Sequence, residues 1–350
     1  MAGFDSGATL AERMRAHAAD STHLYGELMR ALADDWDAGG PVRSICRGWE
    51  ESPQGTVLQL RLLAGLFRIV LTGRAPQLVP YYPCLGGTAP PSQAWPQVRE
   101  VLVDNVDELH DALAIAPQTN EVGRSGALLL GLFESVRRSG RRRVRLLEVG
   151  ASAGLNLLVD RFRFEQAAWS FGPADSPLVF RDMFIGDVEP EEFEIVERRG
   201  CDLHPVDITT DEGRLRLRSF VWPFQPERHE RLMSALEVAA QCPVEVDPFP
   251  AGEWLEDQLA RGTDGDVLTV VWHSVTRMYW PPEETRRVDA TVAAAARRGP
   301  VAHVAMEHAP DVMSGADLTL SGIGSDGRPS FVEQTLATVA DHGIPVTVHA

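Results

Sequence analysis

A short apolar run meets a turn of small residues in Leu146-Leu147-Glu148-Val149-Gly150-Ala151-Ser152-Ala153-Gly154-Leu155-Asn156. An apolar run of this length that ends in glycine is typical of a buried parallel strand. The small residues let the backbone approach a ligand closely, and the helix that we expect next would offer free N–H groups to an anion or polar group. The segment therefore predicts a strand, a turn and a helix with a ligand at the turn, although a tight turn without a ligand has the same composition.

The sequence around this turn alternates between strand-like and helix-like stretches. Candidate strands cover residues 193–196 continuing towards 203, 244–246, 267–272, 301–306, 318–323 and 345–348. Helical stretches at 214–240 and 283–297 supply the crossovers that parallel strands require. Turn signals at 325–327 and 341–343 indicate antiparallel strands at the end, while 169–187 is an insertion or hairpin. We therefore expect an α/β fold, a doubly wound and mostly parallel sheet with antiparallel C-terminal strands, over 141–350.

The sequence before the turn predicts helices. Apolar residues recur at spacings of three and four in 10–19, 24–32, 57–71, 98–113 and 125–136. A stretch rich in Pro and Gly, 80–96, interrupts this pattern. We expect two domains, a helical N-terminal lobe over 1–140 and the α/β domain over 141–350.

Composition excludes several classes of function. The 33 basic residues are all Arg, so an NTPase or kinase that grips phosphate with Lys is excluded, as is Schiff-base chemistry. A net charge of −17 argues against a nucleic-acid partner and favours a small-molecule substrate. The four cysteines form no CxxC pair, and no stretch has the pattern of a signal peptide or membrane span, so we expect a cytoplasmic protein with no membrane partner and no metal.

The residues of the turn can be compared with three known sequence motifs. A dinucleotide fingerprint would need glycine where Ser152 and Leu155 stand, so it fails. A methyltransferase turn, E-x-G-x-G-x-G, keeps Glu148, Gly150 and Gly154 and replaces its middle glycine by Ser152. The nucleophile elbow of serine hydrolases, G-x-S-x-G, matches fully, but the helical sequence upstream lacks the strands and oxyanion loop of that fold. The hydrolase, with Ser152 as nucleophile, stays open as an alternative.

Polar residues at the ends of the later strands fit a cofactor site. A carboxylate can bind the two hydroxyls of a ribose, and Asp202 follows the second strand, with Asp207 as the fallback. Asp247 ends the third strand, within reach of an adenine. His273 and Ser274 end the fourth strand, at the carboxyl edge where such sheets bind ligands.

A polar segment also precedes the helix predicted at 125–136. Asn120 has the character of a helix N-cap, with Glu121 in the first turn. Alternatively the segment lies over the glycine turn and contributes Gln118, Asn120, Glu121 or Arg124 to a cofactor or substrate. Two of the three asparagines, Asn120 and Asn156, fall in these two segments.

The chain resembles the domain-of-unknown-function 2332 family over most of its length. The resemblance rests on the segments 118–124, 148–157, 200–207, 221–223 and 273–275. It implies a Rossmann-like sheet similar to class I S-adenosylmethionine-dependent methyltransferases in the second lobe, and it implies no substrate. Ser152 departs from the broader methyltransferase pattern.

Together these observations predict an S-adenosylmethionine-dependent methyltransferase of a small-molecule acceptor. The residues expected to bind the cofactor are Glu148, Gly150, Ser152, Gly154, Asn156, Asp202 and Asp247. His273 or Glu121 would take a proton from the acceptor, with Gln118, Asn120, Arg124 and Ser274 as further contacts. The alternatives are a serine hydrolase and a non-catalytic binding protein that kept the methyltransferase fold.

Overall fold

The computed structural model describes residues 8–262, 265–309 and 314–349. The chain divides into two compact units, one formed by Met1–Thr119 and Thr210–Glu230 and the other by Asn120–Thr209 and Arg231–Ala350. The predicted boundary at residue 140 differs from this division because helix α7 (Ser125–Ser139) packs against the sheet of the second unit. The segment 210–230 also belongs to the first unit rather than to the α/β domain.

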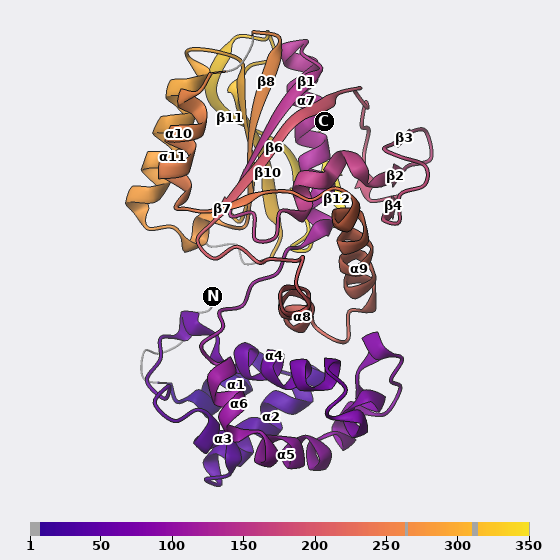
Figure 1. Ribbon diagram of the computed structural model, residues 1–350, viewed down its shortest axis with the longest axis vertical. Coiled ribbons are helices and arrows are strands. Elements are labelled where there is room, and N and C mark those ends of the chain that lie inside the picture. Colours follow the sequence, from indigo (N-terminus) through magenta and orange to yellow (C-terminus); the bar gives the residue numbers. More distant parts are fainter. Residues whose placement is uncertain (1–7, 263–264, 310–313, 350) are drawn as a thin grey trace. The chain divides into compact units, whose positions relative to one another are not determined.

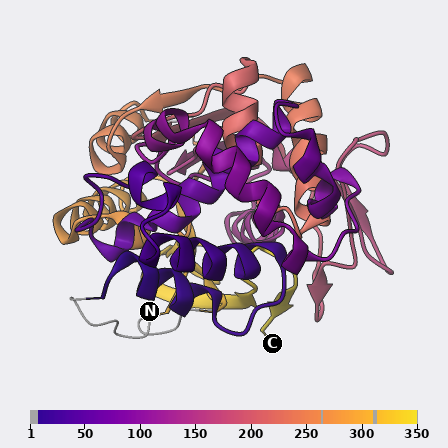
Figure 2. The same cartoon turned by 90° about the horizontal axis from the view of Figure 1, so that it is seen from below.

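The first unit is helical, as predicted for most of its length (Figures 1 and 2). Its helices are α1 (Leu10–Ala18), α2 (Leu24–Asp37), α3 (Pro41–Ile45), α4 (Leu58–Leu71), α5 (Trp95–Asp104), α6 (Val106–Ala112) and α8 (Asp211–Phe220). The helix predicted over 98–113 is two helices, because the backbone leaves the helical region at Asn105. The helix predicted over 214–240 is also two, α8 and α9 (Pro226–Gln241), because Pro223 lies between them and cannot donate a helical hydrogen bond.

Helix α4 is the core helix of the first unit. Ten of its residues are buried, and the large apolar ones, Phe67 included, pack with α1, α2 and the aromatic side chain of Tyr82 in one apolar cluster. By length and composition alone, the segment Gln54–Leu71 could also cross a membrane, and more than half of it is buried inside the protein. Burial on this scale is what a core helix requires.

The second unit is built on a nine-stranded sheet in the order β5-β12-β11-β10-β9-β8-β1-β6-β7. The central strands β7, β6, β1, β8 and β9 are parallel, and β9, β10, β11 and β12 pair antiparallel, as predicted. The strands are β1 (Arg143–Val149), β5 (Phe184–Ile185), β6 (Glu194–Asp202), β7 (Val246–Pro248), β8 (Val267–Ser274), β9 (Val301–Glu307), β10 (Ala316–Ile323), β11 (Pro329–Val339) and β12 (Val346–Val348).

The order of the strands reverses beside β1. The chain passes from β1 to β6 on one side and later returns to β8 on the other side, so the carboxyl ends of β1 and β8 flank a topological switch point. Open α/β sheets bind their ligands outside the carboxyl ends of the strands at such a point. The glycine turn directly follows β1 and therefore lies at this position.

Helices cover both faces of the sheet (Figure 1). Val301 of β9 packs with α10 (Ala251–Ala260) and α11 (Pro282–Ala296). On the other face, Val304 lies so close to α7 that a Cβ on Gly131 would be 2.4 Å from its Cγ1. Side chains three residues apart on a strand point to opposite faces, which explains why the two valines contact different helices.

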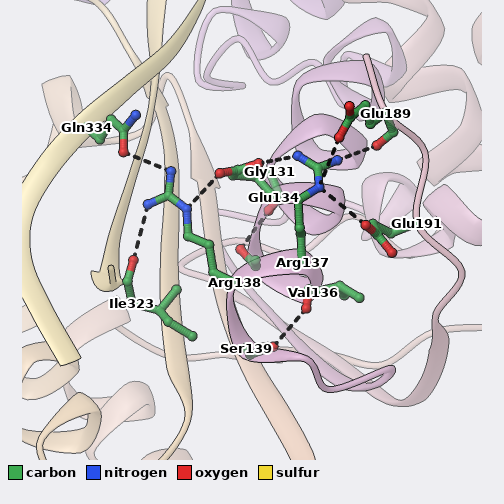
Figure 3. Close-up of polar contacts among 11 residues, drawn as sticks. Gly131, Glu134, Val136, Arg137, Arg138, Ser139, Glu189, Glu191, Ile323 and Gln334 are labelled. Carbon is green, nitrogen blue, oxygen red and sulfur yellow. Dashed lines mark hydrogen bonds and ion pairs between the residues drawn. The ribbon is translucent and has the colours of Figure 1, made fainter. Parts of the chain in front are cut away.

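Helix α7 is fixed to its surroundings at its C-terminal end, where it stops at Gly140 in the left-handed conformation. Figure 3 shows Arg137 and Arg138 reaching from this end in two directions. Arg138 hydrogen-bonds the β10–β11 hairpin, and Arg137 the segment before β6. The partners are Glu134, Glu189, Glu191, Ile323 and Gln334.

The segment between β1 and β6 departs from the expected crossover. The helix predicted after the glycine turn is a short 3-10 helix, η6 (Leu155–Arg161), with a kink at Leu158. The predicted insertion at 169–187 contributes to a separate three-stranded sheet of β2 (Arg163–Glu165), β3 (Ser170–Phe171) and β4 (Val179–Arg181). Strand β5 follows and pairs with β12 at the edge of the large sheet.

Candidate functional site

The glycine turn is a left-handed, closely packed backbone. Gly150, Ser152 and Gly154 all have positive φ, at 70°, 56° and 75°. The threonine hydroxyl of Thr276 lies over Gly150, where a Cβ would be 2.3 Å from its Oγ1. Glycine is therefore required at position 150 by both conformation and space, whereas Ser152 occupies a conformation that costs a non-glycine residue roughly 1–2 kcal/mol.

The N–H groups of the turn are bound within the protein. Ser152 N–H donates to Asp202 Oδ2 at 2.9 Å. The N–H groups of Ala153 and Leu155 donate to Asn120 Oδ1 at 3.2 and 2.9 Å. The sequence-based expectation that these amides are free for an anion is therefore wrong, because Asn120 occupies them. Asn120 holds the turn and does not cap α7, and it is Glu121 that accepts the N–H of Gly123 at 3.1 Å before that helix.

Glu148 is a buried carboxyl group at the carboxyl end of β1. Its Oε1 accepts a 3.5 Å hydrogen bond from Asn156 Nδ2, and Ser125 Oγ donates to Asn156 Oδ1 at 2.7 Å. No hydrogen bond of good geometry from the described residues reaches its other oxygen, Oε2, although the indole of Trp272, whose Nε1 also lacks such a bond, lies beside it on β8. Burial raises the pKa of Glu148 to about 8, although Asn156 and the Trp272 indole oppose the shift. Near neutral pH this carboxyl group is mainly protonated, and a cation beside Oε2 would ionise it.

The acids at the other strand ends have different surroundings. Asp202 is the last residue of β6, and its two oxygens accept the N–H groups of Ser152 and His204, both at 2.9 Å. Asp207 lies beyond the strand and accepts from Thr209. Asp202 is therefore the acid whose carboxylate is hydrogen-bonded to the glycine turn.

Asp247 is held by the protein itself. Both of its carboxylate oxygens lie within 3.0 Å of Arg199 Nη2, and Oδ2 also accepts the indole N–H of Trp254 at 2.7 Å. These contacts occupy both oxygens of Asp247 and reduce its capacity for a ligand.

At the end of β8, His273 takes part in a buried chain of three side chains. Its Nδ1 donates to Glu307 Oε1 at 2.6 Å, and its Nε2 is 3.0 Å from His303 Nε2. His273 is fully buried, with Trp280 packed against its ring. With both ring nitrogens engaged and no exposed surface, His273 does not reach an acceptor in this conformation, so its expected role as the base is not supported by the geometry.

The other residues predicted to contact a cofactor or substrate do not all lie at the glycine turn. Arg124 donates to the carbonyls of Ser274 and Asp341, at 3.2 and 3.3 Å, and so ties the end of β8 to the loop after β11. Glu121 lies 3.9 Å from His342 Nδ1. Gln118 belongs to the first unit. Asn120, Glu148, Ser152, Asn156 and Asp202 thus share one network at the glycine turn, while Arg124 and Ser274 lie at the neighbouring strand end.

The serine-hydrolase arrangement is not present at Ser152. Its Oγ is buried and has no hydrogen-bond partner in the part of the chain that the structure describes. A serine nucleophile needs a histidine within hydrogen-bond reach. The turn also follows the first strand of the sheet, whereas the elbow of that fold follows several strands.

Sequence reasoning missed Thr276, His303 and Glu307. Glu307 carried a usable signal, because it ends an apolar run of strand length as Asp202 and Asp247 do. Thr276 and His303 carried none, since their roles depend on the pairing of β8 with β9. Within the described ranges, no group of three or more His, Cys, Asp or Glu side chains could hold a metal ion.

The comparisons with known proteins give one match. No curated protein and no solved structure matches the chain. The sequence profile of DUF2332, described as an uncharacterized protein conserved in bacteria, matches residues 8–348 and so covers nearly the whole sequence. The chain belongs to the DUF2332 family.

Proposed function

We propose that this protein is an S-adenosylmethionine-dependent methyltransferase that acts on a small molecule. The observation that carries the proposal is Oε2 of Glu148, a buried carboxyl oxygen that receives no hydrogen bond of good geometry from the described residues and lies beside a glycine turn at the switch point of the sheet. Burying such a group without a partner costs free energy, and it is expected where a ligand supplies the partner. S-adenosylmethionine carries two cationic groups, its ammonium and its sulfonium, either of which would pair with this oxygen.

The order of the parallel strands supports a nucleotide-type cofactor. Numbered along the chain, β1, β6, β7, β8 and β9 lie in the order 3-2-1-4-5, which is the order of the Rossmann sheet. This likeness is an analogy at the level of the fold, and the function rests on the site.

The residues of the turn fit an adenosyl cofactor in part. Each carboxylate oxygen has more than one lone-pair site, so Asp202 can hold Ser152 N–H and still accept from a ribose hydroxyl. Gly150 and Gly154 allow the close backbone approach that the methionyl part would need. Asp247 fits an adenine amine less well, because Arg199 and Trp254 already occupy it.

The cofactor supplies an activated methyl group, and the protein supplies alignment. Glu148, Asp202 and the turn would hold the cofactor with its methyl group towards the carboxyl edge of β8, in a site from which water is excluded. The net charge of −17 repels a polyanion, which favours a small-molecule acceptor over nucleic acid.

Isothermal titration calorimetry with S-adenosylmethionine and S-adenosylhomocysteine tests the proposal. We expect saturable binding to the wild-type protein and loss of binding in Gly150→Ala, where the new Cβ meets Thr276. Gly140→Ala is the matched control, since Gly140 is also left-handed but its Cβ would meet nothing within 4 Å. Absence of binding to the wild-type protein would sink the proposal. Binding without transfer to any acceptor would favour a non-catalytic binding protein.

A further inference from the structure

Glu307 presents one carboxylate oxygen at the carboxyl edge of the sheet while its other oxygen is firmly held. Glu307 ends β9, next to the end of β8, where Ser274 pairs with Met306. Its Oε1 accepts from His273 Nδ1 at 2.6 Å and from the N–H groups of Thr276 and Arg277 at 3.0 and 3.3 Å. The described residues make no hydrogen bond to Oε2, and the side chain is 16% exposed.

The same contacts keep Glu307 ionised. Burial by itself would raise the pKa of this carboxyl group, but the hydrogen bonds from His273, Thr276 and Arg277 outweigh burial and leave the pKa below its usual value. Arg277, whose N–H binds Glu307, does not neutralise it with its side chain, because its guanidinium pairs with Asp289 at 2.7 Å. A charged oxygen therefore remains for a partner that the described residues do not supply.

Two buried histidines extend the hydrogen-bond chain that begins at Glu307. An ionised carboxylate only accepts hydrogen bonds, so His273 Nδ1 carries a proton, and one proton lies between the Nε2 atoms of His273 and His303. Burial and the neighbouring His273 lower the pKa of His303 well below its usual value, so His303 is neutral. The chain of hydrogen bonds fixes the direction in which Glu307 points.

This carboxylate is also linked to the glycine turn. Thr276 donates its N–H to Glu307 and places its side chain over Gly150. Glu307 is therefore separated from the proposed cofactor site by a single residue, on the side of β8 away from β6.

We propose that Glu307 Oε2 binds the cationic or N–H-bearing nitrogen of a small molecule, with His273 and His303 as positioning residues for that carboxylate. An anionic oxygen with no cation of its own selects a donor, and a charged ammonium forms the stronger, charge-assisted bond. The identification of this small molecule as the methyl acceptor rests on the proposed function. The binding of an amine at Glu307 does not depend on the proposed function.

The test follows histidine ring nitrogens by NMR in the full chain labelled with 15N-histidine. The probe is propylammonium chloride, and propanol is the uncharged probe of similar size. We expect propylammonium to shift the His273 Nδ1 resonance saturably and propanol to leave it unchanged. In Glu307→Gln the response should be at least tenfold weaker, while Glu256→Gln, which removes the same charge from an exposed ion pair with Arg287, should respond like the wild type.

Three further variants, one at Glu307 and two at His303, complete the test. Glu307→Asp keeps the charge on a shorter side chain and should retain a weaker saturable response if Glu307→Gln fails to fold. His303→Leu should weaken amine binding several-fold, and His303→Gln, which keeps a polar group beside His273, should restore it. A purely structural role for His303 predicts equal amine binding in both variants and would overturn its assignment.

The outcomes separate this inference from the proposed function. No response of wild-type His273 to propylammonium, or an equal response in Glu307→Gln, overturns the amine site whatever the cofactor titrations show. A Glu307-dependent response in a protein that binds no S-adenosylmethionine supports the amine site and removes only the methyl transfer.

Discussion

Thr276 lies directly over Gly150, so that any side chain at position 150 would overlap its hydroxyl oxygen. The contact joins the loop after β8 to the glycine turn after β1, across the switch point of the sheet. It also connects the turn to Glu307, which accepts the N–H of Thr276. The turn is thus held from the β8 side by a side-chain contact and from the β6 side by Asp202.

We expect Gly150→Ala to destabilise the protein by about 3 kcal/mol, because alanine at a φ of 70° is strained and its Cβ meets Thr276. Gly140→Ala carries the strain alone and should cost about 1 kcal/mol. Urea denaturation of both variants measures the difference. Equal losses would show that the contact with Thr276 has no energetic weight.

Asn120→Ala should destabilise the protein by roughly 2–3 kcal/mol, because the buried N–H groups of Ala153 and Leu155 lose their acceptor. Asn105→Ala is a suitable control, since the Asn105 side chain donates a single hydrogen bond at a helix end. Thermal unfolding of the two variants compares them. A loss for Asn120→Ala no larger than that for Asn105→Ala would contradict the role of Asn120 in the turn.

Ser152→Gly should leave the protein as stable or stabilise it by about 0.5 kcal/mol. Glycine relieves the left-handed strain and removes a buried hydroxyl without a partner, which together offset its greater entropy in the unfolded chain. The variant should keep cofactor binding, because it restores the middle glycine of the methyltransferase turn. A fluorophosphonate probe should leave wild-type Ser152 unlabelled, and stoichiometric labelling would instead favour the hydrolase.

Much of the sheet could be predicted because its central strands are continuous apolar runs. Strands β1, β8 and β9 lie where the sequence places them, since burial on both faces leaves a continuous apolar run. Strands β6 and β10 also lie there, although β6 is mostly exposed or half-buried before Gly200 and β10 alternates between buried and half-buried residues. The breaks at Asn105 and near Pro223 were harder, because the helical periodicity continues across them in the sequence. The division at Thr119 was not predictable from composition, as α7 resembles the helices before it and only its packing assigns it to the second unit.

The part of the candidate site at the glycine turn was predicted from the sequence, whereas the pair of His273 and Glu307 beside the turn was not. Glu148, Gly150 and Ser152 were found because a motif places them at fixed spacings along one strand–turn unit, and Asp202 was found because it ends the next strand of the sheet. The pairing of His273 with Glu307 spans 34 residues and depends on the register between β8 and β9, which no local pattern encodes. For Asn120 the sequence left open a helix cap and a place over the glycine turn, because cap residues have the same chemistry as residues that hold a turn, and the structure places it at the turn.

The pH dependence of stability tests the burial of Glu148. Its pKa is about 8 in the folded protein against 4.5 as the ordinary value, so the folded state binds the extra proton between these limits. Stability should therefore fall as pH rises from 4.5 to 8, by up to about 1 kcal/mol per pH unit. Glu148→Gln lacks this dependence, and its stability relative to the wild type should rise over the same range. Parallel curves in urea denaturation at pH 5, 6.5 and 8 would contradict the assignment.

The most direct measurement of the central claim is the proton count on cofactor binding. Titration of wild type and Glu148→Gln with S-adenosylmethionine at pH 7, in two buffers of different ionisation enthalpy, gives that number. We predict release of nearly one proton by the wild type, because the cofactor's cation ionises Glu148, and none by the variant. S-adenosylhomocysteine should release the same proton if its ammonium is the partner, and none if the sulfonium is. Binding with no proton release, or with equal release by both proteins, would contradict the pairing of Glu148 with the cofactor.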